Sequence, residues 1–278
     1  HVAVFARHPP NVLVAPERLH RRIRGDWQLL PWLRSRVPRR QGEPGPADLS
    51  FFDRWLIVDN LRRSLSAPAL LAFFAAGWLL LPGPAWLWTV LASVPFVVPA
   101  LLGGARASVG VFGRLTRHAA GGATGTVRRS LGDVRRSLGD VRRGLLALAF
   151  LPAEAVLAAD AVVRTLFRLR RRRRLLQWTS DALVHLRLGA TLGSVRAWRE
   201  LWLPVVLAVA LAGLVAVLAP EALPAAAPVL LLWLFSPQLA AWTSRPERRL
   251  KPRDATPEER QRLRRLARRT WHFYEEIV

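Results

Sequence analysis

Two long stretches of the chain carry almost no charge, and prolines interrupt each of them near its centre. Residues 64–103 contain no charged side chain, and residues 204–244 contain one, Glu221. A helix of forty residues extends about 60 Å, roughly twice the 30 Å thickness of a membrane's hydrocarbon core. The prolines at 82–84 and 220–224 favour the end of one helix and the start of the next. The pattern therefore predicts two helical hairpins, with helices over 66–81, 85–103, 204–219 and 224–243.

These apolar helices have two possible environments, the core of a large soluble protein and a lipid bilayer. Buried helices of a soluble core normally keep some polar face. The chain is 51% hydrophobic and yet carries a formal net charge of +23. Segregation of apolar blocks into a membrane, with basic blocks beside it, accounts for both values. We therefore expect an all-α integral membrane protein, with two transmembrane helical hairpins and amphipathic or interfacial cytoplasmic helices.

The basic residues lie in three regions that the hairpins separate. Residues 1–63 hold 12 lysines and arginines, residues 104–203 hold 19 and residues 245–278 hold 11. A hairpin returns the chain to the side from which it entered, so all three regions share one side of the membrane. The positive-inside rule makes that side the cytoplasm. The expectation is a multi-pass protein with both ends cytoplasmic.

A further apolar segment, residues 145–167, is long enough to cross a membrane, but it contains Pro152, Glu154, Asp160 and Arg164. A crossing would place the arginines before it and after it on opposite sides. A helix in the membrane plane avoids this conflict and keeps its carboxylates in water. We therefore expect an interfacial helix here, with Asp160 and Arg164 forming an i,i+4 ion pair.

A repeat of seven residues places one apolar stripe along residues 127–144, between arginine pairs. Such a basic amphipathic helix either lies on anionic headgroups or packs its stripe on a neighbouring domain. Residues 170–174 are five consecutive arginines after an apolar helix, a pattern typical of contact with anionic lipid. Nucleic-acid binding has no motif to support it, because zinc-finger spacing and RNP-type strands are missing from the sequence.

The sequence contains no complete catalytic motif. There is no cysteine, no HExxH, no GxSxG and no histidine cluster with metal-ligand spacing, so we assign no catalytic and no metal-binding residue. Residues 17–32 combine clustered arginines with a carboxylate, an amide and two indoles. On composition alone, a basic pre-membrane helix with a tryptophan anchor explains this stretch. A site for a diphosphate and a sugar ring is the alternative.

Four motifs, in order, resemble the cyclic β-1,2-glucan synthases, which are large bacterial inner-membrane enzymes. HRRIRGDWQLLPWL (20–33) is similar to the segment that closes the family's glycosyltransferase domain. FFDRWLIVDNLRRSL (51–65) resembles the entry to its first membrane hairpin. RRRLLQWTSD (172–181) resembles its central cytoplasmic segment, and residues 249–278 resemble the helix that leads into its glycoamylase-like and phosphorylase-like regions.

The resemblance implies a processive transferase that uses UDP-glucose and builds its glucan at the cytoplasmic face. By similarity to the QxxRW motif of cellulose-synthase-like transferases, the donor diphosphate and the acceptor end would be lined by Arg21, Arg24, Asp26, Trp27 and Gln28. Arg22 departs from the family, which has tryptophan there. The catalytic base and the carboxylates that hold Mg²⁺ or Mn²⁺ would lie upstream of this chain.

The implied organisation has five parts. Residues 1–50 would end the glycosyltransferase domain, 51–103 would form the first hairpin with its pre-membrane helix, and 104–203 would be the basic cytoplasmic region. Residues 204–244 would form the second hairpin, and 245–278 would lead to a C-terminal domain. Because the chain lacks methionine and starts at His1, we expect a fragment. We expect it to be inactive alone, since the resemblance places the catalytic base upstream and the phosphorylase-like region downstream of this sequence. Its expected partners are the bilayer, the growing glucan, and the transferase and phosphorylase-like domains of the full-length chain.

One alternative function remains open. A non-enzymatic membrane scaffold would bind anionic lipid through the same arginine-rich amphipathic helices. A transferase domain with a DxD-type carboxylate pair upstream in the gene would favour the enzyme, whereas a start codon just before His1 would favour the scaffold.

Overall fold

The computed structural model describes residues 14–34, 36–37, 45–46, 49–117, 123–171, 193–244 and 256–277. These residues are almost entirely helical, which confirms the predicted all-α class; the exception is an antiparallel pairing of β1 (Arg36–Val37) with β2 (Gly45–Pro46). The chain divides into two units, His1–Arg245 and Pro246–Val278, and each is described by itself. The segment 172–192, which contains most of the predicted arginine run and the RRRLLQWTSD motif, lies outside the described residues.

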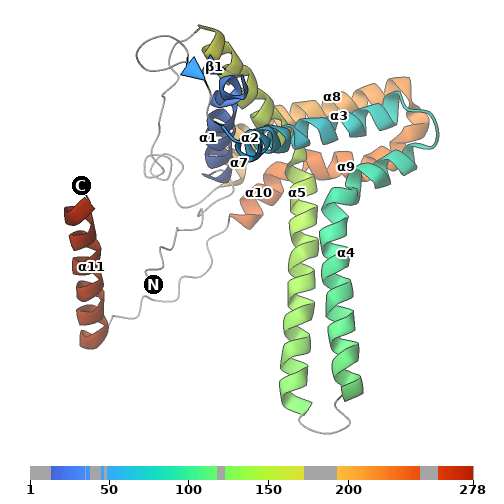
Figure 1. Ribbon diagram of the computed structural model, residues 1–278. Helices are drawn as coiled ribbons and strands as arrows, with labels where there is room; N and C mark the ends of the chain where they lie inside the picture. The colour runs from blue at the N-terminus through green and yellow to red at the C-terminus, as the bar shows by residue number, and fades with distance from the viewer. Residues whose placement is uncertain are drawn as a thin grey trace. The chain divides into compact units, whose positions relative to one another are not determined.

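Two helical hairpins form a bundle in the first unit. The first pairs α3 (Ser66–Leu79) with the start of α4 (Ala85–Arg117), and the second pairs α8 (Trp202–Leu218) with α9 (Leu223–Leu234). Figure 1 shows the four helices side by side, with both turns at the same end of the bundle. Gly83 has φ of +95°, a left-handed conformation that glycine adopts without strain, and a 3₁₀ turn, η3 (Pro220–Ala222), closes the second hairpin. The helix pairs therefore lie where the prolines predicted them.

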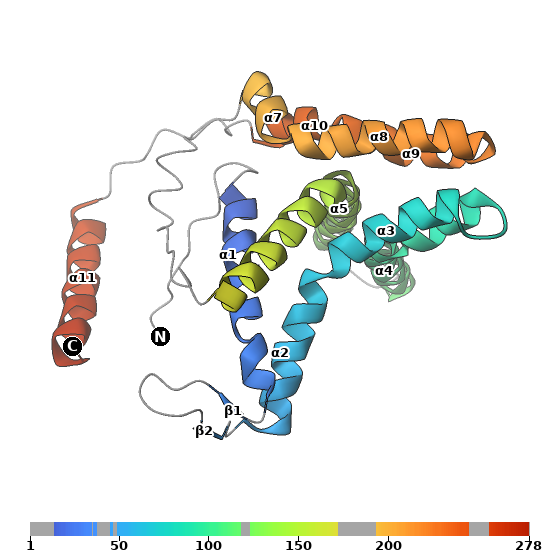
Figure 2. The same ribbon diagram turned by 90° about the horizontal axis from the view of Figure 1, so that it is seen from above.

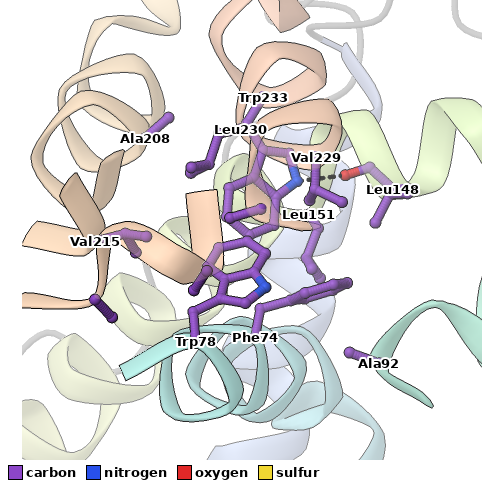
Figure 3. Packing of buried hydrophobic residues seen from close by; sticks show 13 residues of the cluster. Phe74, Trp78, Ala92, Leu148, Leu151, Ala208, Val215, Val229, Leu230 and Trp233 are labelled. Carbon is purple, nitrogen blue, oxygen red and sulfur yellow. Dashed lines mark hydrogen bonds between the residues drawn. The ribbon is translucent and has the colours of Figure 1, made fainter. Parts of the chain in front are cut away.

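The core of the bundle is built around three aromatic side chains. The ring centroids of Phe74 and Trp78 are 5.4 Å apart, and the ring of Phe74 meets that of Trp233 edge to face at 5.5 Å. Ala208 and Val215 of α8 complete the packing between the hairpins, as Figure 3 shows. A close approach tightens the first hairpin, because a Cβ atom on Gly77 would lie 2.5 Å from the Cβ of Trp88.

A long helix, α5 (Ala123–Arg171), joins this core through Leu148 and Leu151 and continues through a buried proline, Pro152. Proline has no amide N–H, so Pro152 gives no helical hydrogen bond to the carbonyl of Leu148, four residues earlier. The indole N–H of Trp233 donates to that carbonyl instead, at 2.9 Å (Figure 3). The bundle thus supplies the donor that the helix lacks.

Both α4 and α5 are longer than the sequence predicted. We expected α4 to end near residue 103, but it runs to Arg117 through Pro95 and Pro99. The C-terminal part of α4 and the N-terminal part of α5 lie together as an arm that leaves the bundle crosswise (Figures 1 and 2). Their backbones come close, because a Cβ on Gly103 would lie 2.5 Å from a carboxylate oxygen of Asp140, and a Cβ on Gly144 would overlap the carbonyl of Phe96.

Within the described residues, length and hydropathy single out one unbroken helix that is able to cross a membrane, Arg135–Arg171 of α5. This is the region where the sequence predicted an in-plane helix. The second hairpin meets the same criterion only if bent pairs count as single spans. These pairs are α7 (Ser194–Glu200) with α8, bent by 68°, and the η3–α9 stretch with α10 (Ser236–Thr243), bent by 44°. The first hairpin contributes only shorter apolar helices. The two-hairpin membrane architecture is therefore not confirmed by helix length.

Two shorter helices precede the bundle in the chain; the first packs on α5, and the second packs on the first and continues into α3. These are α1 (Val14–Gln28), followed by the 3₁₀ turn η1 (Leu30–Leu33), and α2 (Phe51–Ser64). The start of α2 is fixed by a capping box, in which the amide of Asp53 donates to the Ser50 hydroxyl and the Asp53 carboxylate accepts from the Ser50 amide, both at 3.1 Å. The Ser50 hydroxyl also donates to this carboxylate and, as the main cause, lowers the pKa of Asp53.

The second unit contains one described helix, α11 (Pro257–Ile277). Thr256 and Glu259 form a capping box at its start, with the Thr256 amide 2.9 Å from a carboxylate oxygen of Glu259. Leu263, Leu266 and Trp271 are exposed on it. Residues next to one another in the sequence thus fix the start of this helix.

Candidate functional site

The five predicted site residues all lie on the last two turns of α1, but they do not share one face. With about 100° of rotation per residue, Arg24 and Trp27 point to one side of the helix, and Arg21 and Gln28 lie next to Arg24. Asp26 is rotated by about 160° from Arg24 on the same geometry. The helix therefore separates the predicted carboxylate from the predicted cationic face.

The face that carries Arg24 packs on the C-terminal half of α5. Ile23 is 2% exposed and lies among Ala158, Ala161 and Val162. One turn before Arg24, the Nε2 atom of His20 lies 3.0 Å from a carboxylate oxygen of Asp160. Figure 2 shows α1 against this part of α5. A small apolar contact and one polar contact thus hold α1 in register on a helix about 140 residues away in sequence.

Trp27 is anchored to α2 as well as to α5. Its indole N–H donates to the hydroxyl of Ser64 at 2.8 Å, and that hydroxyl donates to the Leu61 carbonyl at 2.6 Å. The ring itself packs beside the Ile23 cluster. The indole N–H is therefore already used within the protein, which leaves only part of the ring surface for contact with a sugar.

Arg24 is in a cationic environment. Its side chain is half-buried, and its Nε atom is buried without a hydrogen-bond partner. Burial is the main cause that lowers the pKa of Arg24; Arg168 and Arg164 lower it further, and Asp160 opposes them. Arginine stays protonated in proteins, so this direction describes an unfavourable surrounding for its charge.

Asp26 lies in a different environment on the other side of α1. Burial raises the pKa of its carboxyl group, and the nearby Arg22 guanidinium opposes that rise. Arg22 is exposed and stands one helical turn before Asp26. The structure therefore brings Arg22 to Asp26, and it brings Arg24 to residues of α5.

The sequence prediction did not include the α5 side of this site. Asp160 accepts from the Nε of Arg164 at 2.6 Å, the ion pair that the i,i+4 spacing predicted, and also contacts His20. The local sequence does not show that the partner of these residues is α1. The small side chains at 158 and 161, about one turn apart, are the sequence feature that permits such a close helix contact.

The described residues contain no group of three or more metal-ligand side chains. The arrangement on α1 and α5 is instead suited to binding an anion, since guanidinium groups match the geometry of phosphate oxygens. It offers no positioned nucleophile.

A hollow of about 550 Å³ lies between the turns of the two hairpins. It is lined mainly by apolar side chains, including Trp78 and Trp86, with Glu221 as its one charged residue. It is formed by elements other than α1 and includes none of the predicted site residues.

No family model matches the chain. A comparison with curated proteins finds 33% identity over 275 residues with the cyclic beta-(1,2)-glucan synthase NdvB of Rhizobium meliloti (strain 1021). The match covers 97% of this chain and 9% of that protein, so the chain spans about a tenth of its relative's length. The resemblance drawn from four sequence motifs is thereby confirmed: over nearly its whole length, the chain is similar to one segment of a cyclic β-(1,2)-glucan synthase.

Proposed function

We propose that the chain is the membrane region of a cyclic β-1,2-glucan synthase, which makes its product from UDP-glucose at the cytoplasmic face of the inner membrane. It would join a cytoplasmic glycosyltransferase domain to phosphorylase-like C-terminal domains of the same longer chain. The observation that carries this proposal is the 33% identity to NdvB along 97% of the sequence. A divalent cation would be bound by residues outside this chain.

The surface of the bundle supports its insertion into lipid. Large apolar side chains are exposed on the outside of α4, α8 and α9, among them Leu91, Val94, Val209, Val217 and Leu231. The sequence between Ser66 and Gly103 contains no charge that would oppose insertion. Helices that are apolar on both the inner and the outer face are typical of membrane proteins. Each hairpin would enter and leave the bilayer on the cytoplasmic side.

The proposal places α5 at the cytoplasmic surface, and its packing against α1 supports this position. The part around Ala158 and Ala161 is covered by α1, a helix with charged residues on its other sides. A charged helix of this kind is costly to place in hydrocarbon. We therefore propose that α5 lies at the cytoplasmic surface, where the arginines of α1 contact water.

In this proposal the donor diphosphate and the acceptor end of the glucan lie beside α1. Arg21, Arg24 and Gln28 share the cationic side, whereas Asp26 faces away from Arg24 and would act at a separate contact. Trp27, with its N–H bonded to Ser64, would contact the sugar by its ring face and would also fix the position of α1.

Glucan synthesis by the complete gene product tests the proposal. Membranes that contain the synthase would be incubated with radiolabelled UDP-glucose, and cyclic β-1,2-glucan would be quantified. Arg24→Ala and Trp27→Ala should each lower the rate at least about tenfold, because each removes a contact to a charged or stacked group. Arg143→Ala, which removes an exposed charge paired with Asp140, is the matched control and should keep the rate. Unchanged synthesis in the Arg24 and Trp27 variants would refute the assignment of this site.

One observation supports the scaffold alternative. On the arm, Leu138 and Leu145 are 62% and 54% exposed, on the same stripe as Val141 and beside Arg142 and Arg143. An apolar stripe flanked by arginines is typical of a helix that lies on anionic lipid. A gene product that makes no glucan from UDP-glucose but sediments with phosphatidylglycerol vesicles would favour the scaffold over the synthase.

A further inference from the structure

Charged side chains of α1 and α5 lie near one another where the two helices pack, because His20, one turn before Arg24, is 3.0 Å from Asp160, which in turn accepts from Arg164. Arg168, Arg164 and Asp160 all act electrostatically on Arg24. The side chains that contribute these charges lie on one face of α5, at intervals of four residues. The register is set independently by the contact of His20 with Asp160 and by the burial of Ile23.

The carboxylate in this cluster is already engaged. One oxygen of Asp160 accepts from Arg164 at 2.6 Å, and the other lies 3.0 Å from His20. The Nε atom of Arg24, which is buried, has no hydrogen-bond partner. A buried donor without an acceptor and an excess of positive charge both lower the stability of the folded protein. An anion that accepts hydrogen bonds would remove both unfavourable effects.

We infer that Arg24 and Arg164, with Arg168 beside them, form a binding site for a phosphate group between α1 and α5. Phosphate oxygens accept the paired N–H groups of arginine and carry the charge that the cluster lacks. We take the donor diphosphate as the source of that phosphate, and in this respect the inference rests on the proposed function. Arg164 of α5 is a new member of the site, because motif similarity placed only residues of α1 in it. A lipid headgroup is the other source of the same chemistry.

Direct binding of inorganic pyrophosphate tests the site without requiring catalysis. The purified protein in phosphatidylcholine nanodiscs would be titrated calorimetrically with pyrophosphate. Arg164→Ala should weaken binding about tenfold, the effect of losing one charge-assisted hydrogen bond. Arg143→Ala removes the same charge from the same helix but lies in the arm, paired with Asp140, and should bind like the wild type. If both variants bind pyrophosphate equally, the inference is overturned.

A second arginine variant and the kinetics of the complete synthase also test the site. Arg168→Ala should also weaken binding, which provides a second variant if Arg164→Ala fails to fold. In the complete synthase, Arg164→Ala should raise the KM for UDP-glucose.

If the wild type does not bind pyrophosphate but binds phosphatidylglycerol vesicles in a manner that depends on Arg164, the phosphate site stands and its ligand is a lipid. If the wild type binds neither, the site is refuted. If pyrophosphate binds through Arg164 but the complete gene product makes no glucan from UDP-glucose, the proposed function fails and the site stands.

Discussion

The hydrogen bond from Trp233 to the Leu148 carbonyl makes a measurable prediction about how the bundle holds α5. Replacing Trp233, which is 1% exposed, with phenylalanine keeps an aromatic ring in the core but removes the donor at 2.9 Å from that carbonyl. Because Pro152 has no N–H, the carbonyl is then left buried without its donor. An unsatisfied buried acceptor costs about 1–3 kcal/mol, to which the smaller ring adds a packing cost.

A double-mutant cycle separates these two costs. Pro152→Ala restores the amide N–H that reaches the Leu148 carbonyl along the helix, so the acceptor stays satisfied when Trp233 is replaced. The packing cost of the smaller ring is present in both backgrounds and cancels in the cycle. The cost of Trp233→Phe should therefore be about 1–2 kcal/mol smaller in the Pro152→Ala protein than in the wild type.

Equilibrium unfolding in mixed detergent micelles, followed by far-ultraviolet circular dichroism, would give the four free energies of unfolding. Trp202→Phe, at an exposed tryptophan of the same hairpin, is the matched control and should change stability by less than about 0.5 kcal/mol. An equal cost of Trp233→Phe with and without Pro152 would show that the indole does not replace the missing helical bond, and the reasoning would be wrong.

Three further predictions concern local structure. Gly77→Ala places a Cβ 2.5 Å from the Cβ of Trp88, so it should force α3 and α4 apart and lower stability by about 1–3 kcal/mol, measured by the same unfolding assay; an unchanged value would contradict the close approach. Ile23→Ala should cost about 2–5 kcal/mol or release α1, which increased proteolysis within residues 14–28 would detect. The lowered pKa of Asp53 means that its contribution to α2 is present above the carboxyl's unfolded pKa, near 4, and is lost as the pH falls through the folded pKa. Ser50→Ala should therefore lower the unfolding midpoint at pH 7, and its effect should shrink as the pH falls and Asp53 is protonated, although the bond from the Asp53 amide to Ser50 is lost at every pH. An effect that does not change with pH would contradict the bond between Ser50 and the Asp53 carboxylate.

The sequence was sufficient to predict the helix pairs of the bundle, because their turns are marked locally by prolines and by Gly83. It failed at the ends of the long helices. The predicted helix over 85–103 ends where the apolar sequence ends, and residues 127–144 and 145–167 were predicted as separate helices. The structure instead extends α4 to Arg117 and joins both later segments in α5, because the two helices pack on each other. The donor that supports α5 at Pro152 comes from Trp233, and no local pattern carries that information.

In the candidate site, too, local features could be predicted and the contact between distant segments could not. The arginines of α1 could be recognised from a short motif, and the ion pair of Asp160 with Arg164 from its spacing. Their meeting depends on the packing of Ile23 between small residues of α5, a contact between segments far apart in sequence. Likewise, the motif placed Trp27 in the candidate site but gave no indication that its N–H donates to Ser64 of α2.

The position of α5 relative to the bilayer shows whether the basic regions share one side of the membrane. The chain has no cysteine, so single cysteines at Arg143 and Arg170 provide clean reporters on either side of the apolar window of α5. Each would be labelled with a membrane-impermeant maleimide in intact spheroplasts and in inside-out vesicles. We expect both positions to be labelled only in inside-out vesicles. Labelling of one position from each side would show that α5 crosses the membrane and that the basic regions lie on opposite sides.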